Sequence, residues 1–184
     1  KDPQTTNDVY ASNPNPLEGK INTRALLFDF EATASGSSPS DPALAVGPNH
    51  VMTVFNTGFR IFDKSGTPLT GQLGPTNIFS GGGCCDLTVS YDNDADRWVL
   101  SYLFSSNGSV QVAVSDGPNP VTAGWNVYTV PNVNDYNKLS VWRDGYYLTG
   151  NNGGNASAKA WVVERAAALA GAPTAGIQAF SFPG

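Results

Sequence analysis

The stretch LTVSYDNDADRWVLSYLF, residues 87–104, contains two apolar alternations that flank the polar turn DNDAD (92–96). An apolar residue at every second position predicts a β-strand, and a cluster of Asp and Asn predicts the turn between two strands. Similar alternations begin at Leu44-Ala-Val46 and Leu139-Ser-Val141, followed by the turns GPN and RDG. The chain therefore repeats a hairpin three times.

Each hairpin is followed by further predicted strands. The three Leu-x-Val starts are 43 and 52 residues apart, close to the roughly 40–50 residues of one propeller blade. Second strands are expected at 50–56, 97–104 and 146–151, third strands at 58–66, 109–117 and 158–165, and fourth strands at 67–73, 124–130 and 176–182.

The predicted fold is an all-β domain over residues 24–184. It has three four-stranded antiparallel units at about 41–80, 84–131 and 135–184, which form a partial β-propeller. Propellers close with roughly 4–8 blades, so a longer chain or a second copy would supply the remaining blades. A β-trefoil or another pseudo-threefold β fold is the alternative, because it also uses three four-stranded repeats.

Three segments outside this pattern have their own predictions. Residues 1–23 carry prolines and glycines without periodicity and predict an extended lead-in. The stretch RALLFDFEA (24–32) alternates and predicts a strand. The stretch ERAAALAGAP (164–173) is rich in alanine and ends in Gly-Ala-Pro, which predicts one or two helical turns inside the last unit.

The composition excludes some classes of partner. The chain has 184 residues, 40% of them hydrophobic, with 10 basic and 15 acidic side chains, and no basic run. Nucleic-acid backbones are bound by clustered Lys and Arg, so nucleic acid is not an expected partner. No window approaches 18 consecutive apolar residues, so no membrane span is expected.

Several motifs resemble repeats of secreted bacterial cell-surface proteins with kelch-like or sialidase-like propellers. They are AVGPNHVMTVFNTGFRIFDKSGTPL (45–69), YDNDADRWVLSYL (91–103), DYNKLSVWRDGYYLTGN (135–151) and ERAAALAGAP (164–173). The resemblance covers about residues 41–184 and implies a propeller at an extracellular surface. Members of this group are mostly modules of adhesins or exported proteins, so the resemblance implies location more than catalysis.

Cys84 and Cys85 are the only cysteines of the chain and are adjacent. Neighbouring Cα atoms lie about 3.8 Å apart, below the usual range for a disulfide, so a bond between them needs a distorted ring. Gly81–Gly83 would supply backbone freedom. A vicinal disulfide, free buried thiols and a metal or redox role all stay open, and the disulfide would offer an apolar platform for a ligand such as a sugar.

Asp41, Asp86 and Asp135 each precede the innermost predicted strand of a unit. In a propeller these strand starts meet at one mouth of the central channel, where carboxylates could hold Ca²⁺ or act as an acid/base pair on a glycoside. Ordinary turn formation is the alternative. The DNDAD turn lacks the glycine and glutamate of an EF-hand loop, so it predicts a hairpin tip, with calcium binding outside an EF-hand as the alternative.

Aromatic residues offer the other candidate contacts. Trp125, Trp142 and Tyr146 could build a surface on which a sugar ring stacks, although such side chains also fill the space between blades. The leading functional prediction is a non-catalytic extracellular recognition or adhesion module, with a glycan or another surface protein as partner. The alternatives are a fragment of a glycosidase-like propeller enzyme and a structural module that associates with itself.

Overall fold

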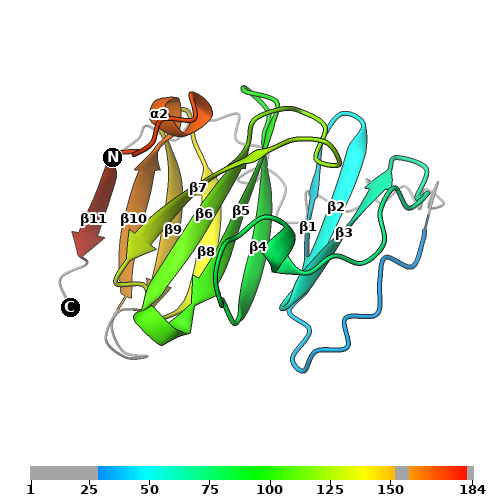
Figure 1. The fold of residues 1–184 in the computed structure, drawn as a ribbon, viewed down its shortest axis with the longest axis horizontal. Helices are drawn as coiled ribbons and strands as arrows, with labels where there is room; N and C mark the ends of the chain where they lie inside the picture. The colour runs from blue at the N-terminus through cyan, green and yellow to red at the C-terminus, as the bar shows by residue number, and fades with distance from the viewer. Residues whose placement is uncertain (1–28, 152–157, 182–184) are drawn as a thin grey trace, which may run out of the picture.

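The computed structural model describes residues 29–151 and 158–181. These residues form an all-β fold in which three antiparallel sheets follow one another along the chain. Figure 1 shows the sheets side by side, the first in cyan, the second in green and the third in yellow to red. The predicted all-β class and the presence of three successive antiparallel sheets are therefore confirmed.

Each sheet is a meander, because its strands pair in chain order. The first sheet contains β1 (Ala43–Val46), β2 (His50–Phe55) and β3 (Gly58–Asp63). The second contains β4 (Cys85–Asp92), β5 (Arg97–Phe104), β6 (Ser109–Ser115) and β7 (Trp125–Pro131). The third contains β8 (Asp135–Val141), β9 (Gly145–Asn151), β10 (Ala158–Glu164) and β11 (Ile177–Ser181). Two short 3₁₀ turns, η1 (Pro75–Asn77) and η2 (Ser105–Asn107), lie in the connections.

The first sheet has three strands instead of the expected four. Residues 67–73 make only two isolated bridges, Leu73 to Phe59 and Pro68 to Phe62. Pro68 has no backbone N–H to donate, so a regular ladder cannot pass through it. The prediction of a fourth strand here was wrong.

The predicted strand at 24–32 was also wrong where the structure describes it, since residues 29–32 have no regular secondary structure. Residues 24–28 and the expected lead-in 1–23 lie outside the described residues. The Phe30 ring packs on Phe62 of β3, with ring centroids 5.1 Å apart. The segment from Asp29 therefore crosses the outer face of the first sheet as a strap.

The second sheet lies between the other two and is buried on both faces. Neighbouring residues of β5, Val99 and Leu100, point to opposite faces and are both fully buried. One core cluster, with Met52 and Trp98, lies between the first and second sheets. The other, with Val112 and Trp161, lies between the second and third. The outer faces of the first and third sheets have no such covering sheet among the described residues.

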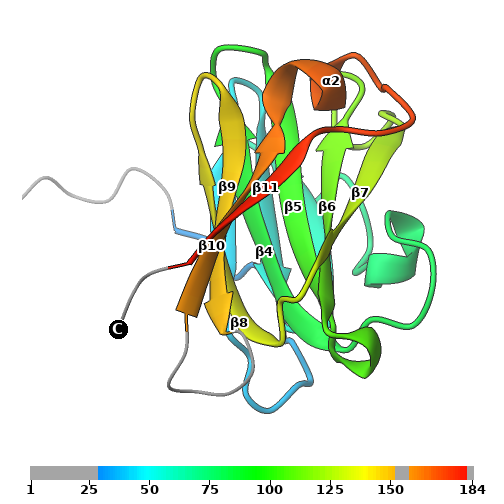
Figure 2. The ribbon, with the colours of Figure 1, turned by 90° about the vertical axis from the view of Figure 1, so that its left-hand side faces the viewer.

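The predicted helical turns are present as α2 (Arg165–Leu169), between β10 and β11. Figure 2 shows α2 at one end of the sheets. Ala168 anchors the helix because its side chain is fully buried in the second core cluster. No helix in the described part of the chain has both the length and the apolar character needed to cross a membrane.

The first strands of the three sheets, β1, β4 and β8, are neighbours, because β4 contacts both β1 and β8. Since these strands run from the same end, their first residues lie close together. The opposite end carries the hairpin turns β1–β2, β4–β5 and β8–β9. The fold thus gathers residues from three distant parts of the sequence at each end.

Candidate functional site

The same β-bulge opens the first strand of every sheet. In the second sheet the pairing shifts register between Cys85 and Thr88, and in the third between Asp135 and Lys138. In the first sheet Asn56 N–H donates to the carbonyl of Ser40 at 2.8 Å, one residue out of step with the β1–β2 ladder. A bulge inserts one extra residue and bends the strand.

The extra residue of each bulge has a positive φ, at Asp41 (φ 44), Asp86 (φ 55) and Tyr136 (φ 57). Asp is among the residues that tolerate this left-handed backbone, whereas it is rare for a bulky aromatic side chain. The sequence prediction placed Asp135 with Asp41 and Asp86. In the structure Tyr136 occupies the matching position, and Asp135 precedes it by one residue.

The three bulges enclose a pocket of about 240 Å³, called here the Asp86 pocket. The backbone N–H of Tyr136 points to two carboxylates, Asp86 Oδ2 at 3.2 Å and Asp135 Oδ1 at 2.8 Å. The Lys138 ammonium lies 3.8 Å from the centroid of the Tyr136 ring, a cation–π contact. The pocket is lined by Asp41, Pro42, Ala43, Asp86, Leu87, Thr88, Tyr136 and Lys138.

The pKa of Asp86 is raised above the ordinary value for an aspartate. Partial burial is the main reason that its pKa is raised, and the negative charges of Asp135 and Asp41 add to the shift. The Tyr136 N–H and the Lys138 ammonium oppose it by favouring the charged form. Asp41 and Asp86 line the same pocket, and Asp135 shares the Tyr136 N–H donor with Asp86, while a joint role of the three carboxylates stays a prediction.

Two asparagines hold the backbone of Asp86 from opposite sides. Asn56 of the first sheet accepts a hydrogen bond from Asp86 N–H at 2.5 Å. Asn137 of the third sheet donates to the Asp86 carbonyl at 3.1 Å and to Ser101 Oγ at 2.8 Å. Ser101 Oγ in turn lies 2.6 Å from Thr88 Oγ1. The residues that support the pocket thus come from all three sheets.

Cys84 and Cys85 form a disulfide, which confirms one of the three alternatives left open by the sequence. Both side chains are partly buried and pack against the core cluster between the second and third sheets. Gly83, directly before them, packs against Tyr102 so closely that a Cβ at this position would lie 2.1 Å from the Tyr102 ring. The disulfide adjoins Asp86 in the chain but is not part of the pocket lining, so its role as a platform for a ligand stays a prediction.

A calcium site at the three aspartates also stays a prediction. Within residues 29–151 and 158–181, no group of three or more His, Cys, Asp or Glu side chains is close enough to hold a metal ion. Asp86 and Asp135 both accept a hydrogen bond from Tyr136 N–H. A cation would have to compete with that donor for the same oxygens.

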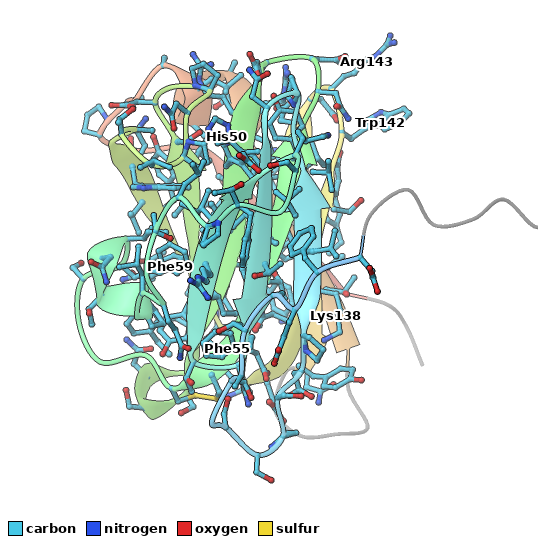
Figure 3. All side chains as sticks on the ribbon, turned by 90° about the vertical axis from the view of Figure 1, so that its right-hand side faces the viewer. His50, Phe55, Phe59, Lys138, Trp142 and Arg143 are labelled. Atoms are coloured by element: carbon cyan, nitrogen blue, oxygen red, sulfur yellow. A yellow bond between two sulfur atoms is a disulfide. The ribbon has the colours of Figure 1, made fainter. Side chains whose placement is uncertain are left out.

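The three aromatic candidates do not meet. Tyr146 is fully buried and donates to Asp92 Oδ2 at 2.9 Å, so its assignment to a ligand surface was wrong and it fills the space between two sheets. Trp125 packs against the first core cluster. Trp142 is 66% exposed and lies near Arg143 at the hairpin end, whereas Lys138 lies farther down the molecule (Figure 3).

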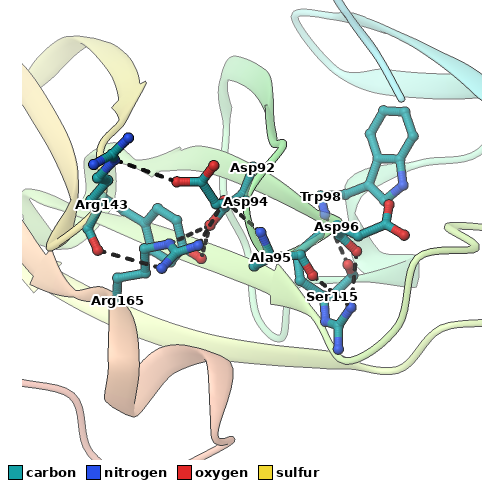
Figure 4. A network of polar contacts seen from close by, with 10 residues as sticks. Asp92, Asp94, Ala95, Asp96, Trp98, Ser115, Arg143 and Arg165 are labelled. Carbon is teal, nitrogen blue, oxygen red and sulfur yellow. Dashed lines mark hydrogen bonds and ion pairs between the residues drawn. The ribbon is translucent and has the colours of Figure 1, made fainter. Parts of the chain in front are cut away.

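A buried ion pair was missed by the sequence prediction, which treated Asp92 as part of a hairpin turn. Arg165 binds both Asp92 oxygens, with Nε–Oδ2 at 2.6 Å and Nη2–Oδ1 at 2.9 Å (Figure 4). Burial raises the pKa of Asp92, but hydrogen bonds from Arg165 and Tyr146 outweigh it, so the pKa is lowered. Tyr146 of β9 and Arg165, which follows β10, both bind Asp92 of β4. This cluster therefore links the second sheet to the third.

No protein-family model, no curated protein and no solved structure matches this chain.

Proposed function

We propose that this protein is a non-catalytic recognition module of the β-propeller type, which binds a carbohydrate at the Asp86 pocket. The observation that carries the proposal is the meeting of three equivalent bulges at one end of β1, β4 and β8. There, Asp41 and Asp86 line one pocket together with Tyr136, a residue that is 64% exposed. In propellers, ligands commonly reach the residues at the mouth of the channel.

The propeller assignment is supported by how the sheets are related. Three antiparallel meanders are not required to stack in the same way, yet each sheet meets the next through its first strand. The repeated bulge also occupies the same place in every sheet. A constant relation between successive antiparallel sheets generates the radial arrangement of a propeller.

The chemistry of the pocket suits a sugar. Carboxylates accept hydrogen bonds from hydroxyl groups, and the face of the Tyr136 ring away from Lys138 offers an apolar surface for the C–H face of a pyranose. Thr88 also lines the pocket. The volume of about 240 Å³ is just under the roughly 300–1,000 Å³ of pockets that enclose drug-sized ligands. A pocket of this size suits one sugar residue of a larger glycan.

An extracellular location belongs to the same proposal. Disulfides persist in oxidising compartments and are rare where thiols are kept reduced. The bonded pair Cys84–Cys85 supports a surface or secreted setting. Such a setting also matches the use of exposed glycans as partners.

The test is a glycan array followed by calorimetric titration of the sugars that bind. Tyr136→Ala and Asp86→Asn are expected to weaken binding by about tenfold or more, since each removes a contact worth about 1.4 kcal/mol. Trp142→Ala is the matched control, because this exposed aromatic lies away from the pocket. Binding that survives both pocket variants, or that only Trp142→Ala removes, would contradict the proposal.

Glycoside hydrolysis is the second candidate, because one observation favours it. Asp86 has a raised pKa and lies near two further carboxylates, Asp41 and Asp135, a pattern that suits a general acid beside a base. The measurement is release of an aryl aglycone from a panel of synthetic glycosides. Turnover that Asp86→Asn abolishes would make the protein an enzyme and overturn the non-catalytic proposal.

Calcium as an aid to binding is tested separately. The heat of binding of CaCl₂ is measured for the wild type and for Asp41→Asn, in the absence of sugar. A site at the three aspartates predicts saturable binding that the variant loses. Heat that is absent from both proteins contradicts the site and leaves the sugar proposal intact.

A further inference from the structure

The strap, residues 29–40, covers the outer face of the first sheet only in part. Leu44 and Val89 hold equivalent positions, because each lies three residues after its bulge residue, Asp41 or Asp86. Val89 is 7% exposed, in the core cluster between the first and second sheets, whereas Leu44 is 61% exposed. The strap has no regular secondary structure. It therefore leaves open a part of the face that a whole sheet fills at the equivalent place.

The open part is a cavity between the strap and the first sheet, called here the strap cavity. Its volume is about 690 Å³, within the roughly 300–1,000 Å³ of sites that enclose small molecules. Ala32 and Ser40 of the strap line it together with Leu44 of β1 and Phe55 of β2. Figure 3 views the molecule from this side, with Phe55 labelled. The strap cavity is thus large enough for a ligand of its own.

The sheet side of the strap cavity is mainly apolar. Phe55 is 2% exposed and Thr53 is 8% exposed, and Leu44 adds an aliphatic side chain to the same lining. None of the described residues that line the cavity carries an ionisable side chain. An unpaired charge is costly in such surroundings. The lining therefore suits a neutral molecule that consists largely of hydrocarbon.

Hydroxyl groups supply the polar part of the lining, and most of them already have an acceptor. The hydroxyls of Thr33, Ser35 and Thr53 each donate to an oxygen of the protein, at 3.0, 3.4 and 3.4 Å. The Ser40 hydroxyl makes no hydrogen bond with another described residue. Ser40 is therefore the side chain with a donor left for one polar group of a ligand.

We propose that the strap cavity binds a neutral alcohol with a hydrocarbon chain, with its hydroxyl group at Ser40. The chain covers Leu44 and removes apolar surface from water, which supplies most of the affinity. The strap cavity shares Pro42 and Ala43 with the Asp86 pocket but contains neither its carboxylates nor Tyr136. The inference therefore does not depend on the sugar proposal.

The experiment is a fluorescence titration with phenylnaphthylamine, a neutral dye whose emission rises in apolar surroundings, followed by competition with decanol. The wild type should bind the dye saturably, and decanol should displace it. Decanoate is the matched charged competitor and should bind at least about tenfold more weakly, because its charge has no partner in the lining. A wild type that does not bind the dye, or that binds decanoate as well as decanol, would overturn the proposal.

Two variants of the lining locate the ligand. Leu44→Glu should weaken the binding of dye and decanol at least about tenfold, because it places a charge beside the hydrocarbon chain. Val46→Glu is the matched control, since it adds the same charge at an exposed position of β1 outside the lining. Ala32→Trp fills the cavity from the strap and should act like Leu44→Glu. Circular dichroism confirms that the variants are folded. Equal losses in Leu44→Glu and Val46→Glu, or unchanged binding in Leu44→Glu and Ala32→Trp, would contradict this location.

Two further variants test the polar contact and the independence from the sugar proposal. Ser40→Ala should weaken decanol about fivefold, the effect of one neutral hydrogen bond, and should change the affinity for the dye, which has no hydroxyl group, much less. Tyr136→Ala alters the Asp86 pocket and should leave both affinities unchanged. Full decanol affinity in Ser40→Ala would contradict the contact with Ser40. Loss of dye binding in Tyr136→Ala would assign the apolar ligand to the Asp86 pocket and overturn the proposal.

Discussion

The backbone N–H of Asp86 donates to the side-chain oxygen of Asn56 across 2.5 Å, and so joins the start of the second sheet to the end of β2 in the first. Asn137 holds the carbonyl of the same residue from the third sheet. A single bulge residue is therefore gripped by both neighbouring sheets. The pocket beside it depends on sheet packing as much as on its own lining.

Asn137→Ala should destabilise the protein by about 2–3 kcal/mol, because it leaves buried groups without hydrogen-bond partners. The side chain is fully buried and supplies donors to the Asp86 carbonyl and to Ser101. The free energy of unfolding in urea measures the loss. Asn77→Ala is the control, since its exposed bond to Gly74 should be worth under about 1 kcal/mol. Equal losses in the two variants would contradict the role given to Asn137.

Asp92→Asn should cost about 3–5 kcal/mol, because it breaks a buried ion pair and leaves Arg165 without its counter-charge. Asp94→Asn in the same turn is the matched control. Its carboxylate lies 3.8 Å from Arg143 and both side chains are largely exposed, so a loss of under about 1 kcal/mol is expected. Urea unfolding of both variants measures the difference, and a small loss for Asp92→Asn would show that the cluster does not fasten the sheets.

Acid should weaken the contact between the second and third sheets. The pKa of Asp92 is lowered in the folded state. Its stabilisation is complete above the unfolded-state pKa of about 3.9 and is lost as the pH falls through the lower folded-state pKa. The free energy of unfolding measured from neutral to acid pH should therefore fall below about pH 4 more steeply in the wild type than in Asp92→Asn. Parallel profiles would contradict this assignment.

Asp86 should have the opposite effect on the pH dependence, because its pKa is raised in the folded state. The folded protein then binds the proton more tightly, so stability is lost as the pH rises from about 3.9 through the folded-state pKa. Asp86→Asn removes the ionisable group and with it this loss of stability. The variant should gain stability relative to the wild type at neutral pH and lose that advantage in acid. A relative gain that does not change with pH would exclude ionisation as its cause.

Reduction of the Cys84–Cys85 disulfide should have only a small effect on stability. The bond joins adjacent residues, and the loop-closure term for so short a loop is about 1 kcal/mol. Urea unfolding with and without a phosphine reductant measures the change, while a thiol assay confirms reduction. A loss of several kcal/mol would show that the bond supports structure beyond its own loop.

Local sequence patterns predicted most of the strands, though not the irregular segments 29–32 and 67–73, and offered the disulfide as one of three alternatives. Alternating residues such as those of β5 place side chains on two faces regardless of what covers them, and the alanine run before Gly171 favours a short helix wherever it packs. The vicinal disulfide, one of three alternatives for Cys84 and Cys85, needed only that adjacent thiols and free backbone occur together. The repeat pattern also predicted that Asp41, Asp86 and Asp135 lie at the same end of the molecule.

The tertiary structure alone decided which residues share a site. Tyr136 and Lys138 entered the pocket because the bulge shifts the register by one residue, and no local pattern marks that shift. Asp92 became part of the core because its partner Arg165 lies 73 residues away. The same contact buried Tyr146, which the sequence had offered to a ligand. Strand periodicity depends on neighbours along the chain, whereas burial and pairing between sheets depend on which distant residues the packing brings together.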